Sequence, residues 1–347
     1  MTATPDILQT KTAMHASASD HRKLGLALSL MALCLLAPVA LSFGVRSVDW
    51  TQIWSALTDY DPTNPDHVVV QVIRLPRFLS AVLAGAALAS AGALMQGMTR
   101  NPLADPGLLG VNAGASIGVV ICIWILGLSD PAQFIWIALG GGLVASVLVF
   151  ALGNAGRGTP AQLILAGAAV SALGLALTRG VLLISQQTLD VYRFWVLGGF
   201  NGIELDTLAA LLPFFAVGGI ATLFAATTLN ALSLGNDTAR NLGMRVGLAQ
   251  ILIGLAVVVL CGATVSLAGP ITFVGLVVPH LARKVAGSDM RWQVLLSATF
   301  GAVLMICADL TGRLSLFGGN MQAGVMAAFL GGPVLIWIVR KHGGGTL

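Results

Sequence analysis

The sequence predicts an all-α polytopic membrane protein with about ten transmembrane helices. Only 9% of its 347 residues are charged and 56% are hydrophobic, whereas a soluble domain carries about 25% charged residues. The apolar residues gather in runs of the length that a membrane-spanning helix needs, about 20 residues. Backbone polar groups in lipid must be satisfied within the chain, and helices satisfy them locally.

The apolar runs define ten candidate spans. We place them at residues 24–44, 78–98, 107–127, 134–153, 161–184, 207–229, 246–268, 269–282, 293–312 and 321–339. The eighth is short and contains Pro270 and Pro279, so we do not expect it to cross as a regular helix. These boundaries leave an N-terminal tail (1–23), a transmembrane domain (24–340) and a C-terminal tail (341–347).

The distribution of basic residues predicts the orientation. The N-terminus and the loops on its side of the membrane carry 12 of the 18 lysines and arginines, the opposite loops carry five, and Arg179 falls inside a span. Loops rich in Lys and Arg stay in the cytoplasm. Both termini are therefore expected to be cytoplasmic, and the basic isoelectric point reflects topology; we expect no nucleic-acid partner.

Two glycine-rich segments suggest an inverted repeat. "GAALASAGALMQGMTRNP", from Gly85, aligns with "GATVSLAGPITFVGLVVP", from Gly262, and the predicted topology runs them in opposite directions. Inverted repeats are common in transporters. The alternative is close helix packing, because small residues let helix backbones approach each other in lipid.

Motifs for catalysis are absent from the sequence. It contains no phosphate-binding G-x-x-x-x-G-K-[ST] loop and no H-E-x-x-H motif, and the four cysteines lie inside predicted spans without metal-ligand spacing. We therefore expect no cofactor and no metal site in this chain, and no enzymatic activity. Energy for uphill transport must come from a partner or from an ion gradient.

Ion-coupled carriers usually bury ionisable groups near the middle of the membrane. Arg179 is the main candidate here: it either reaches the outer interface along the lipid or faces a central path and pairs with an anionic cargo. Asp309 and Arg313 lie four residues apart near the outer end of a span, which favours a local ion pair over a proton relay.

Long motifs resemble those of one transporter family. "RLPRFLSAVLAGAALASAGALMQGMTRNPLADPGLLGVNAGASIG", "VLGGFNG", "LGNDTARNLG" and "GPITFVGLVVPHLARKVAGSDMR" are similar to the permease subunits of ATP-binding-cassette (ABC) importers for iron–siderophores, haem and cobalamin. The resemblance implies a multi-pass protein of the bacterial inner membrane that pairs with a second permease subunit, identical or related. It also implies two cytoplasmic subunits that use ATP and Mg²⁺, and a periplasmic or lipid-anchored substrate-binding protein.

The resemblance also implies roles for individual residues. In the family, a cytoplasmic segment like residues 233–246 couples the permease to the ATPase; the matching positions are Gly235, Asp237, Ala239, Arg240, Leu242 and Gly243. Arginines of the family that pair with carboxylates of the binding protein match Arg74, Arg77 and Arg313.

A cytoplasmic gate is implied at two further places. Asn101 and Leu103 match one gate loop, and Thr159 and Ala161 match a second; Arg179 is the candidate residue of the path itself. Pro102 and Pro106 interrupt helix, and irregular backbone at membrane depth is tolerated where it faces protein or water. The alternative for the first loop is an ordinary cytoplasmic turn.

The sequence thus predicts the permease of an ABC importer, with a ferric siderophore as cargo and haem or cobalamin as alternatives. An ion-coupled secondary transporter and a membrane enzyme are the competing classes. The segment "NMQAGVM" (320–326) departs from the acidic, proline-containing pattern of the family, so no role is transferred to it.

Overall fold

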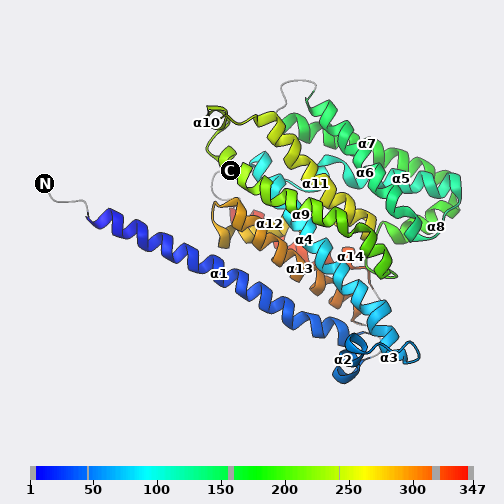
Figure 1. Cartoon of the computed structure of the whole chain (residues 1–347). Coiled ribbons are helices and arrows are strands. Elements are labelled where there is room, and N and C mark those ends of the chain that lie inside the picture. The colour runs from blue at the N-terminus through cyan, green and yellow to red at the C-terminus, as the bar shows by residue number, and fades with distance from the viewer. Residues whose placement is uncertain (1–4, 45–46, 155–159, 242, 315–320, 343–347) are drawn as a thin grey trace.

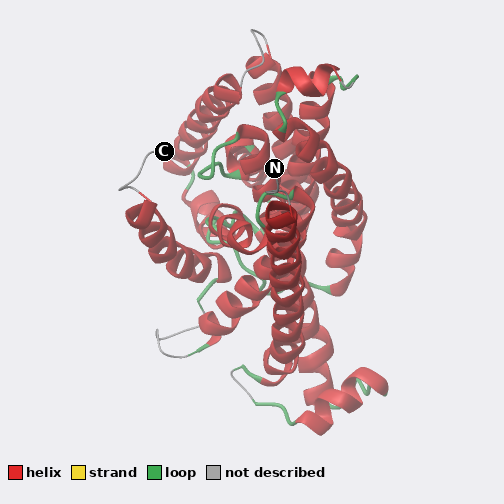
Figure 2. Cartoon of the chain, turned by 90° about the vertical axis from the view of Figure 1, so that its left-hand side faces the viewer, coloured by secondary structure: helices red, strands yellow, loops and turns green. Residues whose placement is uncertain are grey.

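A computed structural model describes residues 5–44, 47–154, 160–241, 243–314 and 321–342, and all regular elements in these ranges are helices (Figures 1 and 2). The elements are α1 (Pro5–Ser42), α2 (Trp50–Thr58), α3 (Pro65–Val68), the π-helix η1 (Val69–Arg74), α4 (Leu75–Thr99), η2 (Pro106–Leu109), α5 (Val111–Leu126), η3 (Pro131–Phe134), α6 (Ile135–Asn154), α7 (Pro160–Ile184), α8 (Gln186–Trp195), α9 (Leu205–Ser233), α10 (Asn236–Asn241), α11 (Val246–Ala268), α12 (Val274–Ala286), α13 (Met290–Arg313) and α14 (Ala323–His342).

Seven segments in the described ranges are long and apolar enough to cross a membrane. They are Asp20–Ser42, Pro65–Thr99, Ile135–Gly153, Ala161–Ile184, Leu205–Ser233, Val246–Ala268 and Met290–Arg313. Two shorter apolar helices, Val111–Leu126 and Ala323–Trp337, fall on the third and tenth predicted spans. The chain is therefore a multi-pass membrane protein, while the total of ten crossings stays a prediction.

The eighth predicted span is irregular at Pro270, whereas Pro279 lies within helix α12. Residues 269–273 are not helical, and α12 has 13 residues, which gives a helix of roughly 20 Å. Gly269 has φ +73° and Phe273 φ +69°, so the backbone turns sharply between α11 and α12. A helix of this length is too short to cross the hydrocarbon core, which is about 30 Å thick.

Helix α4 occupies the centre of the bundle, against α9, α11, α12 and α13. Its glycines make this possible: a Cβ on Gly85 would lie 2.2 Å from the carbonyl oxygen of Gly301, and one on Gly92 would lie 1.9 Å from that of Gly275. Backbones this close exclude any side chain, which confirms the packing interpretation of the glycine-rich segments.

The suggested repeat is not reflected in local structure. Helix α4 continues through Gly92 to Thr99, whereas α11 ends at Ala268, just before the residue aligned with Gly92. The repeat stays a prediction.

The predicted coupling helix α10 and the helices of the predicted outer loops lie at opposite ends of the bundle. Figure 1 places α10 at the upper left and α2 and α3 at the lower right, with α8 on the right. By the predicted topology, α10 lies on the cytoplasmic side and α2, α3 and α8 lie on the outer side.

Candidate functional site

An ionic cluster connects helices at the predicted outer end of the bundle. Arg74 is the last residue of η1, Arg77 lies in the first turn of α4, and Asp309 and Arg313 lie in the last turns of α13. Nε and Nη2 of Arg77 both lie 2.7 Å from Oδ1 of Asp309, and Arg313 Nη2 bonds the other carboxylate oxygen. We call these four residues the outer arginine cluster.

The cluster also caps the C-terminal end of α1. Nη1 of Arg74 lies 2.5 Å from the carbonyl oxygen of Leu41 and 2.8 Å from that of Ser42, and Nη1 of Arg313 lies 2.9 Å from that of Ala40. The last carbonyls of a helix have no partner within it and attract cations. The two arginines therefore anchor α1 to α4 and α13.

The expected ion pair of Asp309 with Arg313 is confirmed, and Arg77 shares the same carboxylate. Asp309 pairs with two of the three arginines, and Asp66 acts electrostatically on the third, Arg74. The surplus of positive charge is confined to the four residues of the cluster, and guanidinium groups suit an acidic partner. However, Arg74 and Arg77 are only 4% and 6% exposed. The sequence predicted them as binding points for an acidic partner. In the isolated chain Arg74 and Arg77 are buried and hold helices together, and their role in docking stays a prediction.

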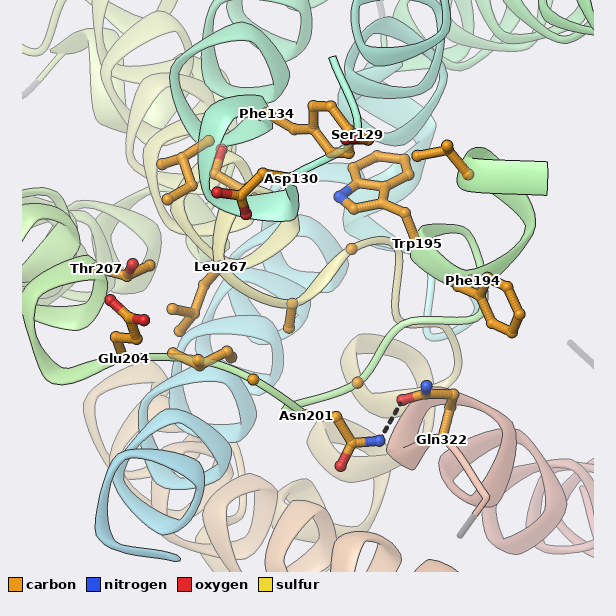
Figure 3. Close-up of a pocket in the computed structure, with 18 of the residues that line it drawn as sticks. Ser129, Asp130, Phe134, Phe194, Trp195, Asn201, Glu204, Thr207, Leu267 and Gln322 are labelled. Carbon is orange, nitrogen blue, oxygen red and sulfur yellow. Dashed lines mark hydrogen bonds between the residues drawn. The ribbon is translucent and has the colours of Figure 1, made fainter. Parts of the chain in front are cut away.

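Asn201 connects the cluster to a cavity. Its Oδ1 accepts a hydrogen bond from Arg77 Nη1, and its Nδ2 donates to Gln322 Oε1 at 3.3 Å, as Figure 3 shows for the second pair. The loop carrying Asn201 needs glycine: Gly198 has φ +65°, and a Cβ there would lie 2.4 Å from the carbonyl oxygen of Pro270. The motif "VLGGFNG" was noted in the sequence, but no residue in it was assigned to the site.

The cavity has a volume of about 540 Å³ and opens between α6, α8, α9 and the end of α11 (Figure 3). Asp130, Asp190 and Glu204 supply carboxylates to its wall, and Trp195 supplies an aromatic face. The hydroxyl of Ser266, also in the wall, is buried without a hydrogen-bond partner among the described residues. The cavity therefore offers acceptors, a stacking surface and the buried hydroxyl of Ser266.

On the predicted cytoplasmic side, residues 100–110 fold back into the bundle after α4 ends. We call them the re-entrant segment. Arg100 has φ +52° and its Nη2 lies 2.9 Å from the carbonyl oxygen of Leu232 in α9. A Cβ on Gly167 of α7 would lie 1.7 Å from the carbonyl oxygen of Leu108. The predicted interruption of helix at the prolines is confirmed, because α5 begins only at Val111.

Two predicted gate residues lie at the tip of the re-entrant segment. Asn101 is exposed, and its Oδ1 accepts the N–H of Leu103 at 2.9 Å; Leu103 is 45% exposed. This Asx turn leaves the apolar Leu103 side chain exposed at the predicted cytoplasmic end of the fold. The arrangement is compatible with a gate, and the gate itself stays a prediction.

Asp105 caps η2 inside the same segment. Its Oδ1 accepts the N–H of Gly107 at 2.7 Å, which is the usual role of Asp before a helix. Burial nevertheless raises the pKa of this carboxyl above its ordinary value, and the Gly107 N–H opposes that rise only in part. No motif in the sequence predicted a role for Asp105.

The remaining path residues lie on or near α7. Ala161 and Arg179 are both exposed in the isolated chain, and 18 residues separate them, so they stand roughly 27 Å apart along the helix. Thr159 lies outside the described residues. The structure therefore does not bring Arg179 together with the gate loop, and each assignment stays a prediction.

The predicted coupling segment forms a short helix between two glycines. Helix α10 runs from Asn236 to Asn241, and Gly235 and Gly243 have φ +111° and +82°. Ala239 is fully buried, whereas Asp237 and Arg240 point outward and pair with each other at 3.2 Å. The helix is thus anchored on one face and charged on the other; Leu242 lies outside the described residues.

The profile of the FecCD transport family matches residues 30–341. The chain belongs to the FecCD transport family. This member is 40% identical to the probable siderophore transport system permease protein YfiZ of Bacillus subtilis (strain 168), over 86% of this chain and 90% of that protein. It is 39% identical to the ferric enterobactin transport system permease protein FepD of Escherichia coli (strain K12), over 94% of this chain and 98% of that protein.

The fold of this FecCD member also matches a solved structure. A metal-chelate type ABC transporter in an inward-facing conformation superposes with a TM-score of 0.80 at 28% identity, over 91% of this chain and 98% of that chain. The family resemblance found in the sequence is therefore confirmed. These relatives are named as permease proteins of transport systems.

Proposed function

We propose that the chain is the transmembrane permease subunit of a bacterial ABC importer that moves a ferric siderophore across the inner membrane. The observation that carries this proposal is the match to permeases of iron and siderophore transport systems over nearly the whole chain. Relatives named for haem and vitamin B12 transport are 35% and 36% identical, so haem and cobalamin are the alternative cargoes.

The proposed assembly contains two copies of a cytoplasmic ATP-binding subunit, a second permease subunit and a substrate-binding protein outside. The charged face of α10 is the proposed contact with the ATPase. Asp237 and Arg240 are exposed there, while the buried Ala239 transmits displacement of α10 to the helices beneath it. ATP and Mg²⁺ belong to the partner, and this chain supplies the path.

The outer arginine cluster is the proposed docking point of the binding protein. Its positive surplus attracts carboxylates of the partner, and electrostatic attraction of this kind accelerates encounter. Because Asp309 already pairs with Arg77 and Arg313, carboxylates of the partner would compete with it. Docking would then loosen the connection between α4 and α13 at the outer end.

Transport follows from alternating access between the two ends. Closure of the ATPase pair would move α10. That movement would widen or close the cytoplasmic opening, which is formed by Asn101 and Leu103 of the re-entrant segment and by Thr159 and Ala161. Arg179, exposed on α7, is a proposed path residue that would pair with an anionic chelate. Bulky cargo suits a path of small, weakly polar side chains.

The test is uptake into vesicles that contain the permease with its ATPase. We expect ferric siderophore to accumulate only with ATP inside and a loaded binding protein outside. Ferric siderophore, haem and cobalamin should be compared in parallel to identify the cargo. Uptake driven by an ion gradient in the absence of ATP would contradict the proposal and favour a secondary transporter.

A further inference from the structure

A long apolar groove runs along the cytoplasmic half of α9 and α11. Its volume is about 660 Å³, and it extends along α9 from Val217 to Thr228 and along α11 from Leu248 to Val259. Each stretch rises roughly 16 Å, close to the thickness of one leaflet's hydrocarbon layer, about 15 Å. The groove is therefore as long as one leaflet is deep.

Small residues make the surface concave. Ala225, Ala249 and Ala256 are buried and form the floor, while Phe224 and Leu252, which are 69% and 56% exposed, form raised edges. A flat surface formed by two helices would contact an acyl chain along one side only. The concave surface instead fits a single flexible chain along the helix axes.

The two polar side chains that line the groove, Thr228 and Arg245, lie toward its predicted cytoplasmic end. Arg245 is exposed there and has no ion pair with a described residue. It is the N-cap residue of α11, whose first turn receives no side-chain cap, and Gly247 leaves open space beside that turn. Uncapped N–H groups and the helix dipole favour an anion, and the guanidinium adds a full positive charge beside them.

We propose that this groove binds one anionic phospholipid of the cytoplasmic leaflet, with an acyl chain between α9 and α11 and the phosphate at Arg245. The charge arrangement selects this occupant over a second copy of the chain. If the grooves of two copies faced each other across a two-fold axis along the membrane normal, their Arg245 side chains would lie at the same depth in one interface. The like charges would then repel each other. Because Arg245 follows α10 directly, the lipid would lie beside the proposed coupling segment.

The experiment is native mass spectrometry of the full-length protein in detergent, with phosphatidylglycerol or phosphatidylcholine of identical acyl chains added. We expect the wild type to retain phosphatidylglycerol about five-fold better, the factor given by roughly 1 kcal/mol per basic side chain near the surface. Arg245→Gln should abolish this preference. Ala221→Phe, which fills the groove, should reduce retention of both lipids.

Arg291→Gln is the matched control, because Arg291 is also exposed at the start of a spanning helix on the predicted cytoplasmic side but does not line the groove. It should keep the preference. Equal retention of the two lipids by the wild type, or the same preference in Arg245→Gln, would overturn the proposal. So would Ala221→Phe if it separated a permease pair while leaving lipid retention unchanged. Lipid binding does not need the ATPase, so its result is independent of the proposed function.

Discussion

Arg77 and Asp309 form a buried ion pair across 232 residues of sequence, with Nε and Nη2 of the arginine each 2.7 Å from one carboxylate oxygen. The same carboxylate bonds Arg313, so one negative charge holds two guanidinium groups. The outer ends of α4 and α13 are therefore joined by a single aspartate. Its loss leaves two buried cations without their anion.

Asp309→Asn should destabilise the protein strongly. Removing one partner of a buried ion pair costs about 3–5 kcal/mol because the remaining charge is left uncompensated. Asp190→Asn is the matched control, since Asp190 pairs with Arg193 at 3.3 Å on an exposed surface, where such pairs contribute about 0–1 kcal/mol. Unfolding of both variants in detergent measures the difference; equal loss of stability would refute the structural role of Asp309.

Gly85→Ala should weaken the contact between α4 and α13. The new Cβ would lie 2.2 Å from a backbone oxygen, and overpacking typically costs about 1–3 kcal/mol. Gly219→Ala in α9 meets nothing within 4 Å, so it should be neutral or gain about 0.5–1 kcal/mol from helix propensity. The unfolding temperatures of the two variants test this, and the same temperature for both would be incompatible with the close approach.

Asp105 should make stability depend on pH. Burial raises the pKa of its carboxyl in the folded state, so protonation favours folding. The contribution is fully present below the ordinary value of 3.8 and is lost as the pH rises through the raised pKa. Asp105→Asn keeps an acceptor for Gly107 without the charge.

The difference in unfolding temperature between Asp105→Asn and wild type, followed from pH 4 to pH 8, tests the sign of this effect. The difference should increase in favour of the variant as the pH rises, because only the wild type then carries the buried charge. A constant difference would show that the charge of Asp105 carries no folding penalty.

Arg240→Glu should uncouple the chain from its ATPase without unfolding it. The Asp237–Arg240 pair is exposed and contributes little stability, but charge reversal at an interface costs several kcal/mol, which is more than ten-fold in affinity. The measurement is the amount of ATPase that co-purifies with the permease. Arg193→Glu reverses the charge of the same kind of i,i+3 pair on α8 and should leave that amount unchanged. Equal recovery with both variants would remove α10 from the proposed interface.

Local pattern predicted much of the fold and part of the site. The apolar runs predicted the long apolar helices of the fold. The i,i+4 spacing of Asp309 and Arg313 was sufficient to predict their ion pair. These features depend on neighbours in the sequence, so the sequence alone contains them.

Contacts between distant segments could not be predicted in the same way. Nothing local signals that Arg77 reaches Asp309, or that Arg74 bonds the end of α1. The burial of Asp105 depends on helices that come later in the chain. The cavity at Asn201 and Ser266 likewise forms only when α8, α9 and α11 pack together.

The most direct test of the account is purification of this permease from its native membrane in mild detergent, followed by mass spectrometry of the proteins that accompany it. We expect an ATP-binding subunit at one copy per permease, together with a second permease subunit, identical or related. Recovery of the chain alone, under conditions in which a control ABC complex stays intact, would contradict the importer assignment.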